Sequence, residues 1–135
     1  MPKKTIIIIA VILVVVLASG AAVYFFLIRN TKDKPVELYN YAIKDSFVTN
    51  VKDSTKLFKV TVILVLNKKG MDDYIETNQY TIRDTILFIL RDLTEDDIMS
   101  SDIQDKLRVT IPKAINEALN IDNVVSIKFS DFVMQ

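Results

Sequence analysis

The sequence predicts an α+β protein with one membrane-spanning helix near its amino end, followed by a small domain with an antiparallel sheet and two main helices. Three observations support this fold class. The chain opens with a long, uncharged apolar run, later segments alternate with period two as strands do, and two longer segments repeat apolar residues at helical spacing. The remainder, about a hundred residues, is enough for one domain and too short for two.

The apolar run, Thr5–Ile28, contains no charged side chain. At ~1.5 Å of rise per residue it forms a helix of roughly 35 Å, which exceeds a hydrocarbon core of about 30 Å. A cleaved signal peptide is the alternative, with Lys3 and Lys4 as its basic region and Ala18-Ser19-Gly20 as its cleavage site. Because the run continues past these small residues and ends at Arg29, we predict an uncleaved anchor in the lipid bilayer.

The orientation of this anchor is predicted from its short leading tail. Basic residues flank both ends of the run, so the positive-inside rule does not decide. A tail of residues 1–4 favours an amino end in the cytoplasm, a span over 5–28 and an exported domain. The chain has no Cys, which excludes a disulfide framework and is compatible with either side of the membrane.

Residues 29–45 are predicted to form a juxtamembrane linker, with the folded domain over 46–135. The linker contains Pro35 and several large side chains: Val36, Leu38, Tyr39, Tyr41 and Ile43. A solvated spacer has no need of so many apolar and aromatic groups. They either contact a partner near the membrane or pack onto the domain as an extra strand.

Three segments are predicted to be strands, and the strongest is Leu57–Leu66, which is rich in β-branched residues and followed by a turn at Asn67–Gly70. Its second half, Ile63–Leu66, is apolar on both faces, so both faces should be covered, within the domain or by a neighbouring copy. Phe47–Val51 is a short candidate. The last is Val124–Met134, in which Val125, Ile127 and Phe129 alternate with polar residues, while Phe132 breaks the parity and predicts a bulge around Ser130-Asp131.

Two helices are predicted between these strands. The first covers about Asp72–Leu93, and steps of about 100° point Phe88 away from its core face. The second begins near Ser101, where Ser101 and Gln104 have capping-box spacing, and it ends near Asn120 with a kink at Pro112. The expected core-facing residues of the two helices are Ile75, Ile82, Ile86, Ile89, Leu90, Leu93, Ile103, Leu107, Ile111, Ala114, Ile115 and Ala118.

The composition removes most catalytic and cofactor chemistry. The chain has no His and no Cys, so the commonest general base, the thiolate nucleophile and the N and S ligands of zinc are missing. With only two glycines it has no Gly-rich phosphate loop. The acidic group around Asp92–Asp102 lacks the glycine and the bidentate carboxylate of a calcium loop; instead Thr94 caps a short turn. We expect no metal and no cofactor.

Net charge and residue spacing argue against two further functional classes, nucleic-acid binding and hydrolysis by carboxylates alone. Residues 29–135 carry 15 basic and 17 acidic side chains, because Lys3 and Lys4 account for two of the 17 basic residues. This net charge of −2, without a basic stripe, argues against a nucleic-acid partner. A hydrolase that uses carboxylates alone would depend on Asp72/Asp73 or Asp96/Asp97. Adjacent helical positions point about 100° apart, so neither pair converges on a substrate.

An ordered set of motifs resembles one known family. After the anchor come Phe47-Val48-Thr49-Asn50-Val51, the strand start Phe58-Lys59-Val60-Thr61, the helical Ile82-Arg83-Asp84 and the final Ser130-Asp131-Phe132-Val133-Met134-Gln135. Together they resemble the FliL family of flagellar basal-body-associated membrane proteins of bacteria. The short linker and Pro112 depart from the family pattern.

The resemblance implies a stomatin-like (SPFH, band 7-like) domain on the periplasmic or extracytoplasmic side of the bacterial inner membrane. It implies a non-enzymatic scaffold at the flagellar basal body that associates with the ion-driven stator of MotA/MotB type and forms a homo-oligomeric ring. Such a protein supports torque, motility, swarming and chemotaxis. An anchored binding or sensing domain outside the flagellum is the alternative. The predicted contact residues are Leu38, Tyr39, Tyr41, Ile63, Val65 and Phe88.

Overall fold

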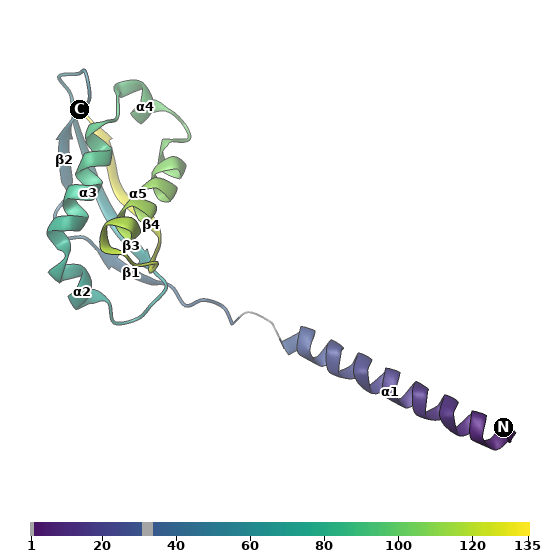
Figure 1. Cartoon of the computed structure of the whole chain (residues 1–135). Helices are drawn as coiled ribbons and strands as arrows, with labels where there is room; N and C mark the ends of the chain where they lie inside the picture. The colour runs from purple at the N-terminus through teal and green to yellow at the C-terminus, as the bar shows by residue number, and fades with distance from the viewer. Residues whose placement is uncertain (1, 31–33) are drawn as a thin grey trace. The chain divides into compact units, whose positions relative to one another are not determined.

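The computed structural model describes residues 2–30 and 34–135. The chain divides into two compact units, Met1–Val36 and Glu37–Gln135, and we call the second the folded domain (Figure 1). The first unit contains helix α1, Lys3–Asn30, which is slightly longer than the predicted span. None of its residues is buried within the structure, and its length and composition are sufficient to cross a membrane. That the anchor stays uncleaved, and which way it faces, remain predictions.

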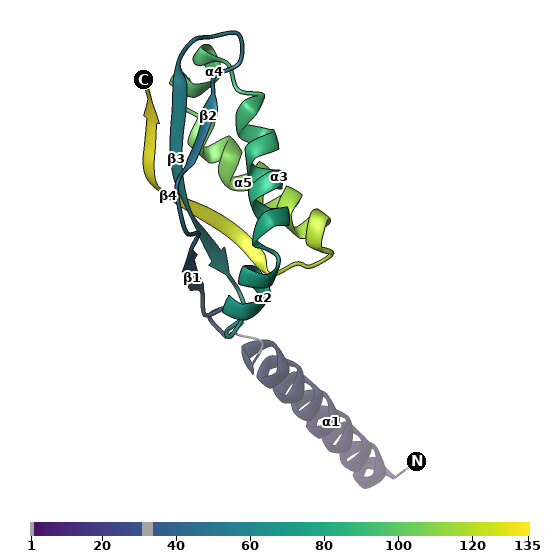
Figure 2. The ribbon, with the colours of Figure 1, turned by 90° about the vertical axis from the view of Figure 1, so that its left-hand side faces the viewer.

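The sheet of the folded domain is antiparallel and built around β3, Leu57–Leu66. Strands β1, Tyr39–Ala42, and β2, Phe47–Asn50, pair with successive halves of one edge of β3. Strand β4, Val124–Met134, pairs along the other edge (Figure 2). The predicted α+β class with an antiparallel sheet is confirmed, and β3 and β4 have the predicted bounds.

The linker prediction over 29–45 is wrong at its carboxyl end. Residues 39–42 form β1, and Tyr39 and Tyr41 pair with Leu66 and Leu64 of β3. The cause is the register of the pairing, which places both tyrosine rings on the face of the sheet that packs against the core. The alternative of an extra strand is therefore the correct one for this segment.

Strand β4 contains two irregularities, one of which was predicted. Asp131 pairs with Thr61 and Phe129 pairs with Val62, so Ser130 is the extra residue of a bulge, as the parity break at Phe132 indicated. The register shifts a second time where Val65 pairs with Ser126 and Leu66 pairs with Val124. Val125 is therefore left without a partner on β3, and its side chain is exposed. The expectation that Val125 faces the same side as Ile127 is wrong, because this second bulge turns Val124 into the core instead.

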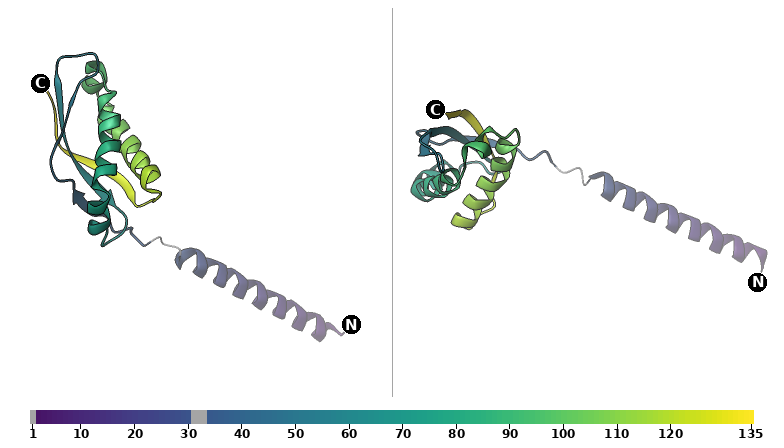
Figure 3. Two further views of the ribbon diagram at one scale, coloured as in Figure 1. Left: turned by 60° about the vertical axis from the view of Figure 1, so that its left-hand side comes forward. Right: turned by 90° about the horizontal axis from the view of Figure 1, so that it is seen from above.

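Four helices cover one face of the sheet (Figures 2 and 3). They are α2 (Asp72–Thr77), α3 (Gln79–Arg91), α4 (Glu95–Met99) and α5 (Ile103–Leu119). Their apolar faces meet the inner face of the sheet in one core, whose fully buried members include Phe47, Phe58, Leu64, Ile75, Ile82, Ile86, Leu90, Ile111, Ile115 and Ile127. Ile89 and Leu93 pack at its border, whereas Ala118 is exposed.

The helix predicted over Asp72–Leu93 is two helices that meet at Asn78. At this break the Tyr74 carbonyl accepts from the Asn78 side-chain amide at 2.9 Å and from the Asn78 backbone N–H at 3.1 Å. The predicted capping box at Ser101 is also wrong, because α5 begins after Asp102 without a side-chain cap. As predicted, α5 ends at Asn120, which adopts the left-handed conformation. The helix runs through the buried Pro112.

Candidate interaction surfaces

The residues predicted to contact partners differ in exposure. Leu38 is 57% exposed, whereas Tyr39 and Tyr41 are half-buried against the core. The Tyr39 hydroxyl donates to a carboxylate oxygen of Glu37 at 2.6 Å, and this bond raises the pKa of Tyr39. Of Leu38, Tyr39 and Tyr41, Leu38 is therefore the most available to a partner.

We expect Tyr41→Ser to lower the melting temperature of the folded domain, because it removes a ring that packs on the core opposite Leu64. The loss is about 2 kcal/mol, as for truncation of a partly buried large side chain. The matched variant Leu38→Ser alters an exposed position and should stay within about 0.5 kcal/mol of wild type. Thermal unfolding followed by circular dichroism measures both. Equal melting temperatures for Tyr41→Ser and wild type would show that β1 does not stabilise the domain.

The two predicted contacts on β3 lie on the sheet face that the helices leave uncovered. Val65 is only 4% exposed, between Asn40 of β1 and Ser126 of β4. Its second face is thus covered within the domain, so Val65 is not available for a neighbour. Ile63 is half-buried between Ala42 and Lys128 and remains a candidate contact.

Arg83 on α3 joins the helix layer to the sheet, a role that the sequence alone did not reveal. Its guanidinium donates to the carbonyls of Lys44 at 2.9 Å, Asp45 at 3.3 Å and Ser46 at 3.3 Å. It also lies 4.4 Å from the centre of the Phe47 ring. These carbonyls belong to the irregular segment between β1 and β2, where Asp45 has a φ of 63°. Arg83 therefore stabilises the point at which the edge of the sheet is interrupted.

Phe88 lies on a hollow surface formed by α3, α4 and α5, which we call the helical groove. The groove has a volume of about 400 Å³. Phe88 is 78% exposed, which confirms that it points away from the core. The groove is lined by Phe88, Ile89, Asp92, Leu93, Asp97, Ser100, Asp102, Ile103, Lys106, Leu107 and Thr110.

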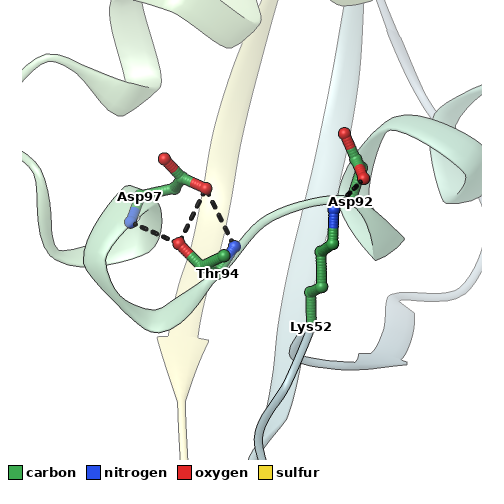
Figure 4. A network of polar contacts seen from close by, with 4 residues as sticks. All are labelled: Lys52, Asp92, Thr94 and Asp97. Atoms are coloured by element: carbon green, nitrogen blue, oxygen red, sulfur yellow. Dashed lines mark hydrogen bonds and ion pairs between the residues drawn. The ribbon is translucent and has the colours of Figure 1, made fainter.

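The carboxylates of the helical groove are held by short polar contacts. Asp97 accepts from the backbone N–H of Thr94 at 2.9 Å and from its hydroxyl at 2.8 Å, and the Asp97 N–H donates to that hydroxyl at 3.2 Å (Figure 4). This capping box confirms the predicted role of Thr94. Asp92 pairs with Lys52 at 2.8 Å, and Asp102 pairs with Lys106 at 3.1 Å.

The contacts of Asp97 and Asp102 lower the pKa of these two groove carboxylates. Bonds from the Thr94 backbone and hydroxyl lower the pKa of Asp97 from its ordinary 3.8. Bonds from the Ser100 hydroxyl and from Lys106 lower the pKa of Asp102. The groove is therefore lined by apolar side chains together with three carboxylates and one lysine.

The capping box gives a pH-dependent prediction. A carboxylate whose pKa is lowered by folding stabilises the fold above its ordinary pKa, and this contribution disappears as the pH falls through the folded value. We expect Asp97→Asn to lower the melting temperature near pH 7, with the difference from wild type shrinking below about pH 4. Asp96→Asn makes the same exchange outside the capping box and is the control. A difference that stays constant from pH 7 to pH 3 would contradict this role.

No group of three or more His, Cys, Asp or Glu residues is placed to bind a metal ion in residues 2–30 and 34–135. Of the pair Asp96/Asp97, the Asp97 carboxylate already accepts hydrogen bonds from Thr94 in the capping box. The geometry offers surfaces for protein contact.

Comparison with known proteins agrees with this description. A family model described as "Flagellar basal body-associated protein FliL" matches residues 40–135, which include all but the first residue of β1 and the complete core. The chain belongs to the FliL family. The family match begins inside β1, and this supports our assignment of β1 to the domain.

One curated relative is the flagellar protein FliL of Aquifex aeolicus (strain VF5). It is 25% identical over 97 residues, which cover 70% of this chain and 60% of the relative. The chain therefore matches less than two thirds of that protein. Family membership and the apolar helix α1 together indicate a membrane-anchored flagellar protein.

Proposed function

We propose that this chain is a non-enzymatic, membrane-anchored scaffold of the bacterial flagellar motor. In this proposal it associates with the ion-driven stator of MotA/MotB type and assembles around it as a ring of identical subunits. Its folded domain is stomatin-like and lies on the periplasmic or extracytoplasmic side of the inner membrane, with the amino end of α1 in the cytoplasm. It supports torque generation and thereby swimming, swarming and chemotaxis.

The observation that carries the proposal is the family match over the folded domain in a chain that begins with a membrane-length apolar helix. The groove chemistry agrees with a scaffold. Its ion pairs and capping bonds satisfy carboxylates, and its apolar lining residues, with the exposed Phe88, are suited to contact another protein.

Deletion and complementation test the proposal. We expect an in-frame deletion to reduce swarming and swimming through soft agar, and the full-length chain to restore both. A tagged full-length chain should co-purify with the stator subunits after mild detergent extraction. Unchanged motility in the deletion strain, together with no recovery of stator subunits, would refute the proposal.

A further inference from the structure

The edge of strand β2 that faces away from β3 borders a hollow beside α3, which we call the edge hollow. It has a volume of about 480 Å³ and is lined by Val48, Thr49, Asn50, Val51, Lys52, Leu57, Leu87 and Arg91. Residues 48–52 of this set are consecutive, and consecutive residues of an extended chain point to opposite faces of a sheet. A hollow that touches all of them therefore lies against the backbone, at the edge of the strand.

The backbone groups of Val48 and Asn50 point to this edge. Asn50 lies opposite Leu57, but the N–H and C=O of Leu57 are both bonded to Gln135 on the other side of β3, at 2.7 and 2.9 Å. Bonded and non-bonded residue pairs alternate along an antiparallel pair of strands, so Val48, two positions before Asn50, also does not bond to β3. The Asn50 carbonyl accepts a long bond from the Thr49 hydroxyl, at 3.4 Å. Both residues therefore present a donor and an acceptor to the edge hollow.

Helix α3 runs beside β2 and the chain bonds this edge at both ends of the hollow (Figures 1 and 2). The Ser46 carbonyl accepts from Arg83 at 3.3 Å, and the Lys52 N–H donates to the Leu93 carbonyl at 3.0 Å. Lys52 and Thr94 thereby form a parallel β-bridge. The edge is thus already paired at one end, and the distance along the strand from Ser46 to Lys52, about 20 Å, leaves room for a short extended segment.

The side chains on α3 favour a segment with one apolar and one acidic residue. Leu87 and Arg91 are four positions apart, which is ~6 Å along a helix. Alternate residues of a strand are ~6.6 Å apart, so two side chains of an extended segment can meet Leu87 and Arg91 in turn. None of the lining residues is acidic. Lys52 is paired with Asp92 at 2.8 Å, whereas Arg91 has no ion-pair partner among the described residues.

The position of α3 also limits what can bind here. Because α3 covers the inner side of this edge, a strand that docks on it cannot carry a helix on its own inner face. Strand β4 has the other free edge of the sheet, but α5 packs on its inner face. A second copy that brought β4 to the edge hollow would press its α5 against α3. The hollow therefore fits an extended segment that is not covered by a helix.

We propose that the edge hollow binds a short extended segment of a partner protein as an added strand. The segment bonds to the backbone of Val48 and Asn50, places an apolar side chain against Leu87 and places a carboxylate against Arg91. The recognised pattern is an apolar residue and an Asp or Glu two positions apart, in either order. This inference uses the folded domain alone and does not depend on the stator or the ring.

Peptide selection on the full-length chain in detergent micelles tests the recognised pattern. Phage that display random short peptides are selected on the immobilised chain. We expect the enriched peptides to share the apolar and acidic pair, and to bind about tenfold more weakly when the acidic residue is changed to its amide, because a charge-assisted bond is lost. Enriched peptides without this pair, or no enrichment over a surface without protein, would overturn the inference.

Two variants separate backbone pairing from charge. Val48→Pro removes an N–H that faces the hollow and no bond to β3, and proline is tolerated at such edge positions. Arg91→Gln removes the cation. Each is expected to weaken binding of the selected peptides about tenfold with a melting temperature near that of wild type. Lys128→Gln removes an exposed cation from β4, on the other side of β3, and should bind as wild type does. If Val48→Pro is unfolded, Arg91→Gln decides alone, and wild-type affinity in either folded variant would contradict the proposal.

Amide hydrogen exchange distinguishes a partner segment from a second copy. We expect the amides of Val48 and Asn50 to exchange freely in the full-length chain alone and to become protected when a selected peptide is added. Protection without peptide that disappears on dilution would show that another copy occupies the hollow, and the partner segment would be wrong. Neither experiment uses a flagellar component, so their failure is separate from failure of the proposed function.

Discussion

Replacing Arg83 with Met is expected to lower the melting temperature of the folded domain more than any other surface substitution considered above. The change leaves the carbonyls of Lys44, Asp45 and Ser46 without their donor and removes the cation from the Phe47 ring. Hydrogen bonds to a charged donor make this loss about 1.5–3 kcal/mol. For a domain of this size each kcal/mol corresponds to roughly 4–8 °C, and thermal unfolding of residues 37–135 measures the shift.

Two variants separate the geometry of Arg83 from its charge. Arg83→Lys keeps the charge but offers no planar fork for three carbonyls, so an intermediate melting temperature is expected. Asp84→Asn changes the next, exposed position and should remain within about 0.5 kcal/mol of wild type. The account of Arg83 is wrong if Arg83→Met unfolds at the wild-type temperature.

Placing charges in the middle of α1 is expected to abolish membrane attachment and motility together. Each charged side chain at the centre of a span costs about 2.5–3.5 kcal/mol on insertion scales, so Val14→Asp with Val15→Arg should move the chain from the membrane to the soluble fraction. Fractionation followed by a swim-plate assay measures both effects. Val14→Leu with Val15→Leu alters the same positions without charge and should preserve attachment and motility.

The mass of the mature wild-type chain decides between an anchor and a signal peptide. A chain that retains Thr5–Ile28 agrees with the anchor. A mature chain that begins at Ala21 or Ala22 would show that α1 is cleaved, and the charged variants would then act through export.

Long, regular segments were predictable from the sequence, and features formed by distant residues were not. β-Branched residues and the turn that follows them predicted the bounds of β3, period-two alternation predicted those of β4, and the parity break at Phe132 located the bulge at Ser130. Strand β1 has only four residues and follows a proline-containing stretch, so its alternation was too short to separate it from a linker. The break at Asn78 coincides with a bond from the Asn78 side chain to the Tyr74 carbonyl, and hydrophobic periodicity does not report such a bond.

The same division applies to the candidate surfaces. Helical geometry predicted that Phe88 is exposed, because this depends only on the residues of one helix. The helical groove was not predicted, since its walls come from three helices. Arg83 donates to carbonyls of residues that lie 37 to 39 positions earlier in the chain, so no local sequence pattern could indicate these bonds.

Fluorescence imaging of the tagged full-length chain in living cells tests the central claim, association with the flagellar stator, most directly. We expect foci at the flagellar bases in wild-type cells and their loss, at equal protein level, when the stator genes are deleted. Foci of unchanged number and brightness without the stator, or a uniform membrane distribution in wild-type cells, would contradict the claim.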